Sequence, residues 1–373
     1  MRLAPLAFAV LFAFAGSVHA QDFRTEKQAV RVVTVAKGLE NPWGLAFLPD
    51  GRILVTERPG RMRIVANDGA LSAPIAGVPR VYARGQGGLL DVTLHPDFAR
   101  NSLVYFTYAE PGESGQGTAA AVARLSADRA RLEDLKIIFR QSPKSGASHH
   151  FGSRIVFARD GRVFITLGDR GQMDLAQDVS VHRGQVIRVE ADGRIPADNP
   201  FIGKTGARPE IWSYGHRNVQ GAAIHPVTGK LWTVEHGPGG GDEVNIPLAG
   251  RNYGWPVIGI GKHYDGTPIG GGVTHKEGME QPIYNWAPAI APSGMDFYTG
   301  DKFPAWRGNL LIALLRTQAL VRLELDGEKV VHEERMLRGI NQRLRQVRQG
   351  PDGYIYLLTD ESDGQILRLE PAR

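Results

Sequence analysis

The 373-residue sequence contains no cysteine. This absence excludes a disulfide framework, a thiolate metal site and a covalently attached haem. The chain also lacks a Gly-x-Gly-x-x-Gly run before a helix and a Gly-Lys-Ser/Thr loop, which argues against a bound nucleotide. There is no polybasic run, and the formal net charge is only +5. We therefore expect neither nucleic-acid binding nor attachment to a membrane surface.

Long apolar runs are scarce as well, and the one near the start of the chain is short. Arg2 precedes an apolar segment from Leu6 to Ala15, and Val18-His19-Ala20 has the small residues of a cleavage site. This pattern predicts that Met1 to Ala20 is a signal peptide and that the mature protein, residues 21–373, is periplasmic or secreted without a membrane span. The alternative is an uncleaved anchor, which would need about 20 apolar residues.

Amphipathic helical periodicity is almost absent, and a β-rich pattern recurs in its place. Each copy has a turn such as Pro-Asp-Gly, a run of branched and aromatic residues, and often a second run after a polar turn. The six copies are Leu48–Val65, His95–Glu110, Ala158–Asp169, His225–Gly237, Trp306–Leu325 and Gly350–Glu370.

This repetition predicts an all-β fold, a single six-bladed β-propeller with four-stranded antiparallel blades. The copies are unevenly spaced, so we expect loop insertions, notably Arg194 to Pro209 and Gly259 to Pro282. A β-sandwich with long loops is the alternative.

Polar residues next to the repeated turns are the candidates for a site, because loops from different propeller blades converge on the central channel. They are Gln86, His149, His150, Arg217, Asn218, Gly237, Pro238, Arg316, Arg343 and Arg345. If the four arginines converge, they require an anionic ligand, since guanidinium groups pair with carboxylate or phosphate and otherwise repel one another. For Arg343 and Arg345 alone, a solvated strand face remains the simpler explanation.

The run from Gly237 to Gly241 offers exposed carbonyl oxygens, and Asp242 and Glu243 follow it directly. Carbonyl and carboxylate oxygens are the ligands that calcium prefers, although most runs of this kind are simply turns. His150 has the side chain suited to a general base, but a lone histidine beside a strand is more often structural. His236 lies in no zinc-binding spacing.

Taken in order, these segments resemble the soluble quinoprotein glucose/sorbosone dehydrogenase family, especially its periplasmic aldose sugar dehydrogenase branch. The resemblance extends from "NPWGLAFLPDGRILVTERPGRM" to "VRQGPDGYIYLLTD" and is most specific in "GHRNVQG", "EHGPGGGDEVN" and "GRNYGWP". It implies a six-bladed propeller that binds pyrroloquinoline quinone, a flat molecule with three carboxylates, together with Ca²⁺. It also implies an aldose sugar as substrate, a lactone as product and an external electron acceptor such as a quinone or a cytochrome.

The resemblance also implies roles for individual residues. His150 would be the general base, and Arg217 would stabilise the developing oxyanion. The cofactor would be bound by Gln86, Arg217, Asn218, Arg316, Arg343 and Arg345. The carbonyls of Gly237 and Pro238 would ligate the calcium at the quinone, while Glu243, the Tyr253 carbonyl and Glu280 would ligate a second, structural calcium.

Two positions depart from the family pattern. Arg316 stands where the family usually has lysine, and His149 stands where some members have an aspartate that orients the base. A second imidazole cannot supply a fixed negative charge to His150. Two other functions remain open from the residues: a calcium-dependent lactonase-type propeller, which has no use for the arginines, and a propeller that serves only as a binding scaffold.

Overall fold

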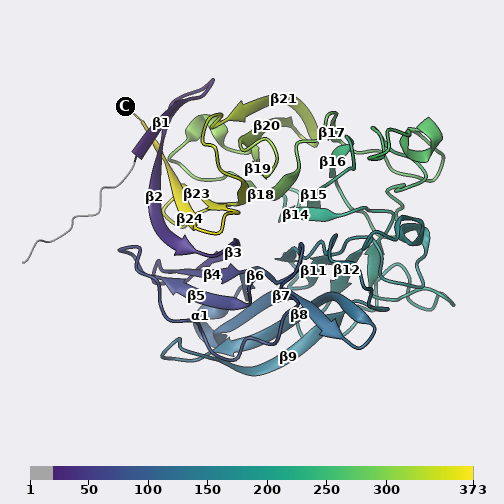
Figure 1. Cartoon of the computed structure of the whole chain (residues 1–373), viewed down its shortest axis with the longest axis horizontal. Coiled ribbons are helices and arrows are strands. Elements are labelled where there is room, and N and C mark those ends of the chain that lie inside the picture. Colours follow the sequence, from purple (N-terminus) through teal and green to yellow (C-terminus); the bar gives the residue numbers. More distant parts are fainter. Residues whose placement is uncertain (1–19, 373) are drawn as a thin grey trace, which may run out of the picture.

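The computed structural model of the chain describes residues 20–372. The predicted signal peptide lies outside this range except for Ala20, the first residue of strand β1. Six antiparallel sheets follow one another around a common centre in chain order (Figure 1). Four sheets have four strands, the first has three, and the sheet that contains both ends of the described chain has five. The predicted all-β, six-bladed β-propeller is confirmed.

The first three blades contain the amino-terminal half of the fold. Blade 1 consists of β3 (Pro42–Phe47), β4 (Ile53–Glu57) and β5 (Arg61–Val65). Blade 2 consists of β6 (Leu89–Leu94), β7 (Leu103–Gly112), β8 (Gly115–Leu125) and β9 (Leu132–Arg140). Blade 3 consists of β10 (Ile155–Phe157), β11 (Val163–Thr166), β12 (Val186–Val189) and β13 (Ile211–Ser213).

The other three blades complete the ring. Blade 4 consists of β14 (Val219–Ile224), β15 (Leu231–Glu235), β16 (Asp242–Asn245) and β17 (Tyr284–Trp286). Blade 5 consists of β18 (Pro292–Phe297), β19 (Leu310–Leu314), β20 (Leu320–Asp326) and β21 (Lys329–Met336). Blade 6 consists of β22 (Leu344–Gln349), β23 (Ile355–Thr359), β24 (Gly364–Pro371), β2 (Ala29–Leu39) and β1 (Ala20–Arg24).

Helices are short and lie in connections. They are α1 (Phe98–Asn101) and the 3₁₀ turns η1 (Met173–Gln177), η2 (Ile269–Gly272) and η3 (Pro304–Trp306). Within residues 20–372, none of the helices has the length and apolar character needed to cross a membrane.

The ring closes by pairing the two ends of the chain. Strand β2 runs antiparallel to β24, from Val30 opposite Pro371 to Leu39 opposite Gly364. The joined strands lie at one side of the ring, next to blade 1 (Figure 1). Main-chain hydrogen bonds therefore hold the amino-terminal strand β2 in the last blade, and the chain continues from β2 directly into blade 1.

Apolar side chains from neighbouring blades pack against each other and form the core. Between blades 4 and 5, Trp232 and Val234 pack with Met295, Phe297 and Ile312, all of which are buried. The second strand is buried along its whole length in every blade except blade 2, where the ends of β7 are partly exposed. This burial explains why the repeated runs lack a clean alternation of polar and apolar residues.

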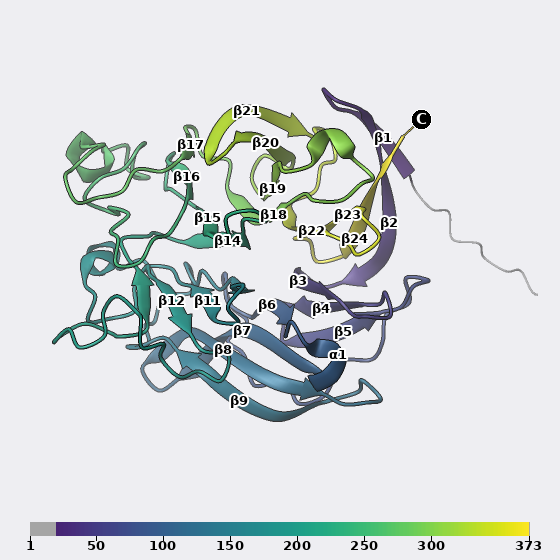
Figure 2. The same cartoon turned by 180° about the vertical axis from the view of Figure 1, so that it is seen from behind.

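The repeated turns and the candidate site residues lie on opposite faces of the propeller. The turns connect the first and second strands of the blades, and Gly51 and Gly353 there adopt φ of 85° and 79°, a region that favours glycine. The loops that lead into each first strand and leave each second strand lie at the other ends of these strands. These loops form the opposite face, which carries the candidate site residues. The long connection between β16 and β17, which includes the predicted insertion Gly259 to Pro282, projects from the outer edge of the ring (Figure 2).

Candidate active site

Strand ends from several blades surround two adjoining cavities. We call the first the arginine cavity; it measures about 140 Å³ and its lining includes Arg58, Gln86, His236, Arg343, Arg345 and Asp360. We call the second the histidine cavity; it measures about 430 Å³ and its lining includes Gln86, His150, Asp169, Arg217, Pro238 and Trp255. Because Gln86 lines both, a ligand in one cavity would lie beside a ligand in the other.

The arginine cavity has more positive than negative groups. Three guanidinium groups line it, from Arg58, Arg343 and Arg345, against the single carboxylate of Asp360. Asp360 Oδ2 lies 2.7 Å from Arg345 and 3.3 Å from Arg343. The buried Nε atoms of Arg58 and Arg345 have no hydrogen-bond partner within the described residues. These donors fit an anionic ligand such as a carboxylate.

The histidine cavity contains a histidine paired with a carboxylate. His150 Nδ1 lies 2.6 Å from Asp169 Oδ1. Beside an ionised carboxylate Nδ1 carries the proton, so Nε2 is left as an acceptor. The backbone of His150 has φ of 55°, and its N–H donates to Gln86 Oε1 at 2.8 Å. Gln86 thus fixes the base in an uncommon backbone conformation.

Burial favours the neutral form of His150. Burial lowers its pKa, although the hydrogen bond and the charge of Asp169 oppose this effect. For Asp169, burial raises the pKa, but the hydrogen bond from His150 outweighs it and keeps the pKa below its ordinary value. A neutral imidazole oriented by an ionised carboxylate can accept a proton at neutral pH.

Asp169 replaces the orienting charge that His149 cannot supply. Asp169 follows β11 in blade 3, whereas His149 is exposed and its ring lies edge-on to that of His150, with centroids 4.5 Å apart. The sequence analysis did not select Asp169. A signal was present, because Asp169 ends a repeat copy, and in two other copies an acidic residue, Glu235 or Asp360, also stands at or just after the end of the second strand.

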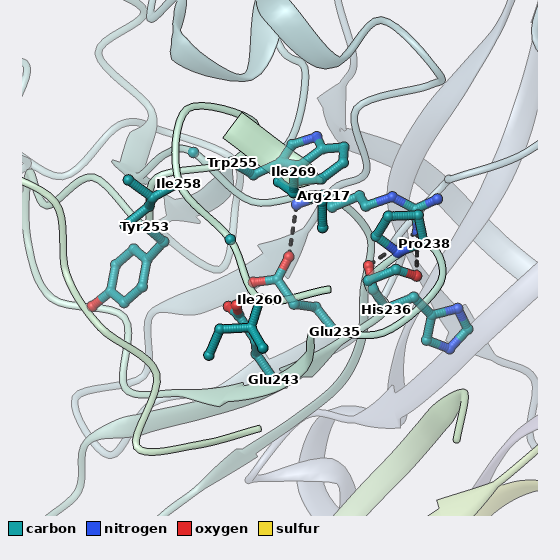
Figure 3. A pocket seen from close by; sticks show the side chains of 14 residues that line it. Arg217, Glu235, His236, Pro238, Glu243, Tyr253, Trp255, Ile258, Ile260 and Ile269 are labelled. Carbon is teal, nitrogen blue, oxygen red and sulfur yellow. Dashed lines mark hydrogen bonds between the residues drawn. The ribbon is translucent and has the colours of Figure 1, made fainter. Parts of the chain in front are cut away.

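Arg217 and Asn218 lie at the start of blade 4, beside the histidine cavity. Arg217 Nη1 donates to the carbonyls of His236 and Gly237, each at 3.0 Å, as Figure 3 shows. Asn218 Oδ1 accepts from the Gly152 N–H at 3.1 Å, while its buried Nδ2 has no partner within residues 20–372. Arg217 therefore places a cation at this edge of the site, while the Asn218 side chain lies behind the cavity surface.

A smaller pocket with two carboxylates lies behind Arg217 (Figure 3). We call it the acidic pocket; its lining includes Glu235, Gly237, Pro238, Glu243 and Tyr253, and it measures about 20 Å³. Burial and the neighbouring charge of Glu235 raise the pKa of Glu243 to about 8. Such a carboxylate pair is unfavourable without a cation.

The donor set of this pocket suits a hard cation. Among residues 20–372, no three His, Cys, Asp or Glu side chains gather closely enough to ligate a metal. A cation here would therefore need backbone carbonyls in addition to carboxylates, a combination that calcium accepts. Gly237 also fits a calcium ligand: its carbonyl has a second lone pair beside the Arg217 contact, and Asp242 Oδ1 fixes its N–H at 2.8 Å.

Three of the predicted residues, Asn218, Arg316 and Glu280, line none of these cavities. Arg316 is exposed and lines none of the three, although its neighbour Leu315 lines the arginine cavity. Glu280 lies 3.5 Å from Arg251 and does not line the acidic pocket. The geometry brings together the other candidates, and it adds Arg58, Asp169, Glu235, Trp255 and Asp360 to them.

The fold and the site define a six-bladed propeller with a polar ligand site on one face. Comparison with known proteins identifies the family. Residues 39–368 match the family described as "Glucose / Sorbosone dehydrogenase". The chain is 47% identical to the aldose sugar dehydrogenase YliI of Escherichia coli over 347 residues, which covers 92% of this chain and 93% of that protein. The protein belongs to the glucose/sorbosone dehydrogenase family, which places it among the oxidoreductases.

Solved structures agree with this assignment. A crystal structure of a glucose dehydrogenase superimposes with a TM-score of 0.90 at 52% identity, covering 92% of this chain and 99% of that chain. The PQQ-bound aldose sugar dehydrogenase of Streptomyces coelicolor superimposes with a TM-score of 0.76 at 30% identity, covering 95% and 99%.

Proposed function

We propose that this protein is a periplasmic aldose sugar dehydrogenase that uses pyrroloquinoline quinone and calcium. The observation that carries the proposal is the arginine cavity, with its surplus of positive charge, directly beside the His150–Asp169 pair. A ligand with several carboxylates fits the first cavity, and a neutral, hydroxyl-rich molecule fits the second. The quinone bound to the relative from Streptomyces coelicolor supports the same choice.

The residues of the chain supply distinct functions. Arg58, Arg343 and Arg345 bind the cofactor carboxylates, and Gln86, which lines both cavities, and Asn218 are further cofactor-binding residues. His150 Nε2 accepts the proton of the anomeric hydroxyl, while Asp169 stabilises the resulting imidazolium. When bound, the quinone supplies the acceptor for the hydride from the anomeric carbon, and calcium polarises the quinone carbonyl. The sugar loses a proton and a hydride, and it leaves as a lactone.

Arg217 has two partners in this scheme. Its guanidinium donates to the Gly237 carbonyl, next to Pro238, which lines the histidine cavity; Gly237 and Pro238 would ligate the calcium at the quinone. A fixed cation at this place stabilises negative charge that develops on the cofactor oxygen. The second calcium would bind Glu243 and the Tyr253 carbonyl in the acidic pocket, and we retain Glu280 and Arg316 only as predictions.

Reconstitution tests the function. The mature, cofactor-free protein receives pyrroloquinoline quinone with and without calcium, and a dye acceptor follows the oxidation of a panel of aldoses. We expect turnover only when the quinone and calcium are both present, and electrons then pass to the dye as the external acceptor. Binding of the quinone without sugar oxidation would contradict the catalytic assignment. Hydrolysis of lactones with calcium alone would favour the lactonase alternative.

A further inference from the structure

Trp255 contacts both halves of the proposed catalytic site. Its indole Nε1 donates to Asp169 Oδ2 at 2.9 Å, while the other oxygen of Asp169 accepts from His150 at 2.6 Å and from the Gly171 N–H at 2.8 Å. Each oxygen of Asp169 therefore has a defined donor. The indole N–H fixes the rotation of the carboxylate that orients His150.

The face of the same indole lies against the catalytic cation. The guanidinium carbon of Arg217 is 5.4 Å from the centroid of the Trp255 ring, within the range of a cation–π contact. Arg217 reaches the Gly237 carbonyl from this position. One side chain thus contacts the Asp169 carboxylate through its edge and Arg217 through its face; Figure 3 shows the Trp255 ring beside Arg217.

The surroundings of Trp255 fix the indole in place. The backbone N–H of Trp255 donates to the Gly215 carbonyl at 2.9 Å, and the backbone carbonyl of Trp255 accepts from Gln177 Nε2 at 2.7 Å. The ring packs with Ala176 in η1 and with Ile269, which lies further along the same connection between β16 and β17 as Trp255 itself. Trp255 is 9% exposed, and this burial strengthens its polar contact with Asp169.

We propose that Trp255 is a positioning residue that aligns the His150–Asp169 pair with Arg217 across the histidine cavity. The inference rests on the proposed function, because it assigns Trp255 to the geometry of that reaction. The charged and titratable groups that act on His150 are Asp169, Arg217, His149 and, behind them, His236. Trp255 contacts two of these four, namely Asp169 and Arg217.

The test separates the edge of the indole from its face. Trp255→Phe keeps an aromatic face for Arg217 and removes the N–H, whereas Trp255→Leu removes both. Trp286→Phe is the matched control, because Trp286 Nε1 donates to a carboxylate, Glu333 Oε2 at 2.8 Å, that lines none of the three cavities. If Trp255→Phe does not fold, 3-benzothienylalanine at position 255 replaces only the N–H by sulfur.

The first measurement is the NMR titration of His150 in cofactor-free protein, with the resonance assigned by His150→Gln. Without the indole donor, Asp169 concentrates its charge on His150, and we expect the titration midpoint to rise by about one pH unit, the effect of one hydrogen bond to a carboxylate. Trp286→Phe leaves the midpoint unchanged. A Trp255→Phe midpoint equal to or below the wild-type value would overturn the inference.

The second measurement uses the reconstituted holoenzyme. In Trp255→Phe, the acidic limb of kcat/KM moves to higher pH with the titration midpoint, while quinone affinity stays near that of the wild type. In Trp255→Leu, quinone affinity falls as well, by about tenfold for a lost cation–π contact. Equal quinone affinity in the Phe and Leu variants would overturn the role assigned to the indole face. The NMR titration needs no turnover, so an inactive wild type would refute the proposed function without deciding this inference.

Discussion

The arginine cavity and the acidic pocket are built from opposite charges. In the arginine cavity, three guanidinium groups face one carboxylate. In the acidic pocket, two carboxylates lie together, and the Arg217 backbone N–H donates to one of them, Glu235 Oε2, at 2.6 Å. Each region is thus short of the charge that the other has in excess.

This difference indicates two ligands of opposite charge. Unpaired charges cost free energy in a folded protein unless a ligand compensates them, so one region is suited to a polyanion and the other to a cation. Strand β15 and the loop after it connect the two regions. His236 lines both of them, and its neighbours in the chain, Glu235 and Gly237, line the acidic pocket. The His150–Asp169 pair belongs to neither region.

The largest expected effect follows from that separation. His150→Gln should reduce turnover by about 10²- to 10⁴-fold, the usual contribution of a general base, because no acceptor then remains for the hydroxyl proton. Quinone and calcium binding should stay close to wild type, since His150 does not line the arginine cavity or the acidic pocket. Steady-state kinetics and a quinone titration check this. A variant that oxidises sugar near the wild-type rate would remove His150 from the mechanism.

Removal of calcium should affect the acidic pocket. At a calcium concentration of a hundred times Kd, ligand linkage stabilises the folded protein by about 2.7 kcal/mol. We expect Glu243→Gln to lose most of this calcium-dependent increase in melting temperature, because it deletes one of two carboxylates. Thermal melts with calcium and with a chelator provide the measurement, and Glu280→Gln serves as a comparison. Equal calcium-dependent shifts in wild type and Glu243→Gln would place the cation elsewhere.

Strong acid should weaken the arginine cavity. Burial by itself raises the pKa of Asp360, but the charge and hydrogen bond of Arg345 lower it to about 2. Because the pKa is depressed in the folded state, Asp360 contributes stability above about pH 4, and this contribution is lost as pH falls towards 2, with a size on the order of 2 kcal/mol. Urea unfolding of wild type and Asp360→Asn at pH 6, 4 and 3 should show the two curves converging. A constant difference would mean that Asp360 is not the ionised partner of Arg345.

The sequence predicted the fold because the repeat was visible in every blade. The turn before β4 and the turn before β23 both read Pro-Asp-Gly, and both mark the face opposite the site. Ring closure was not predictable, because the pairing of Val30 with Pro371 joins residues that no local pattern relates. For the same reason blade 1 has three strands and blade 6 has five.

For the site, spacing along the chain found the loops but not the partners. Gln86, His150, Arg217, Arg343 and Arg345 were predicted, and all line the cavities. Asp169 and Trp255 were missed, because their contact joins residues 86 positions apart and depends on how blades 3 and 4 pack. A carboxylate can neutralise an arginine or orient a histidine only after folding has chosen its neighbour, as Asp360 and Asp169 illustrate.

The smallest expected effect tests whether the positive surplus of the arginine cavity binds the cofactor. Arg343 lies at the rim with a side chain that is 43% exposed, so its contact with a carboxylate is partly screened. Arg343→Ala should weaken quinone affinity by about tenfold, or about 1.4 kcal/mol. Arg338→Ala, an exposed arginine nearby in the chain that lines none of the three cavities, is the matched control. Quinone titrations at two salt concentrations check the result, because the difference between the variants should shrink at high salt if charge is the cause. If both variants bind the quinone as tightly as wild type does, the cofactor carboxylates lie deeper, at Arg345 and Arg58.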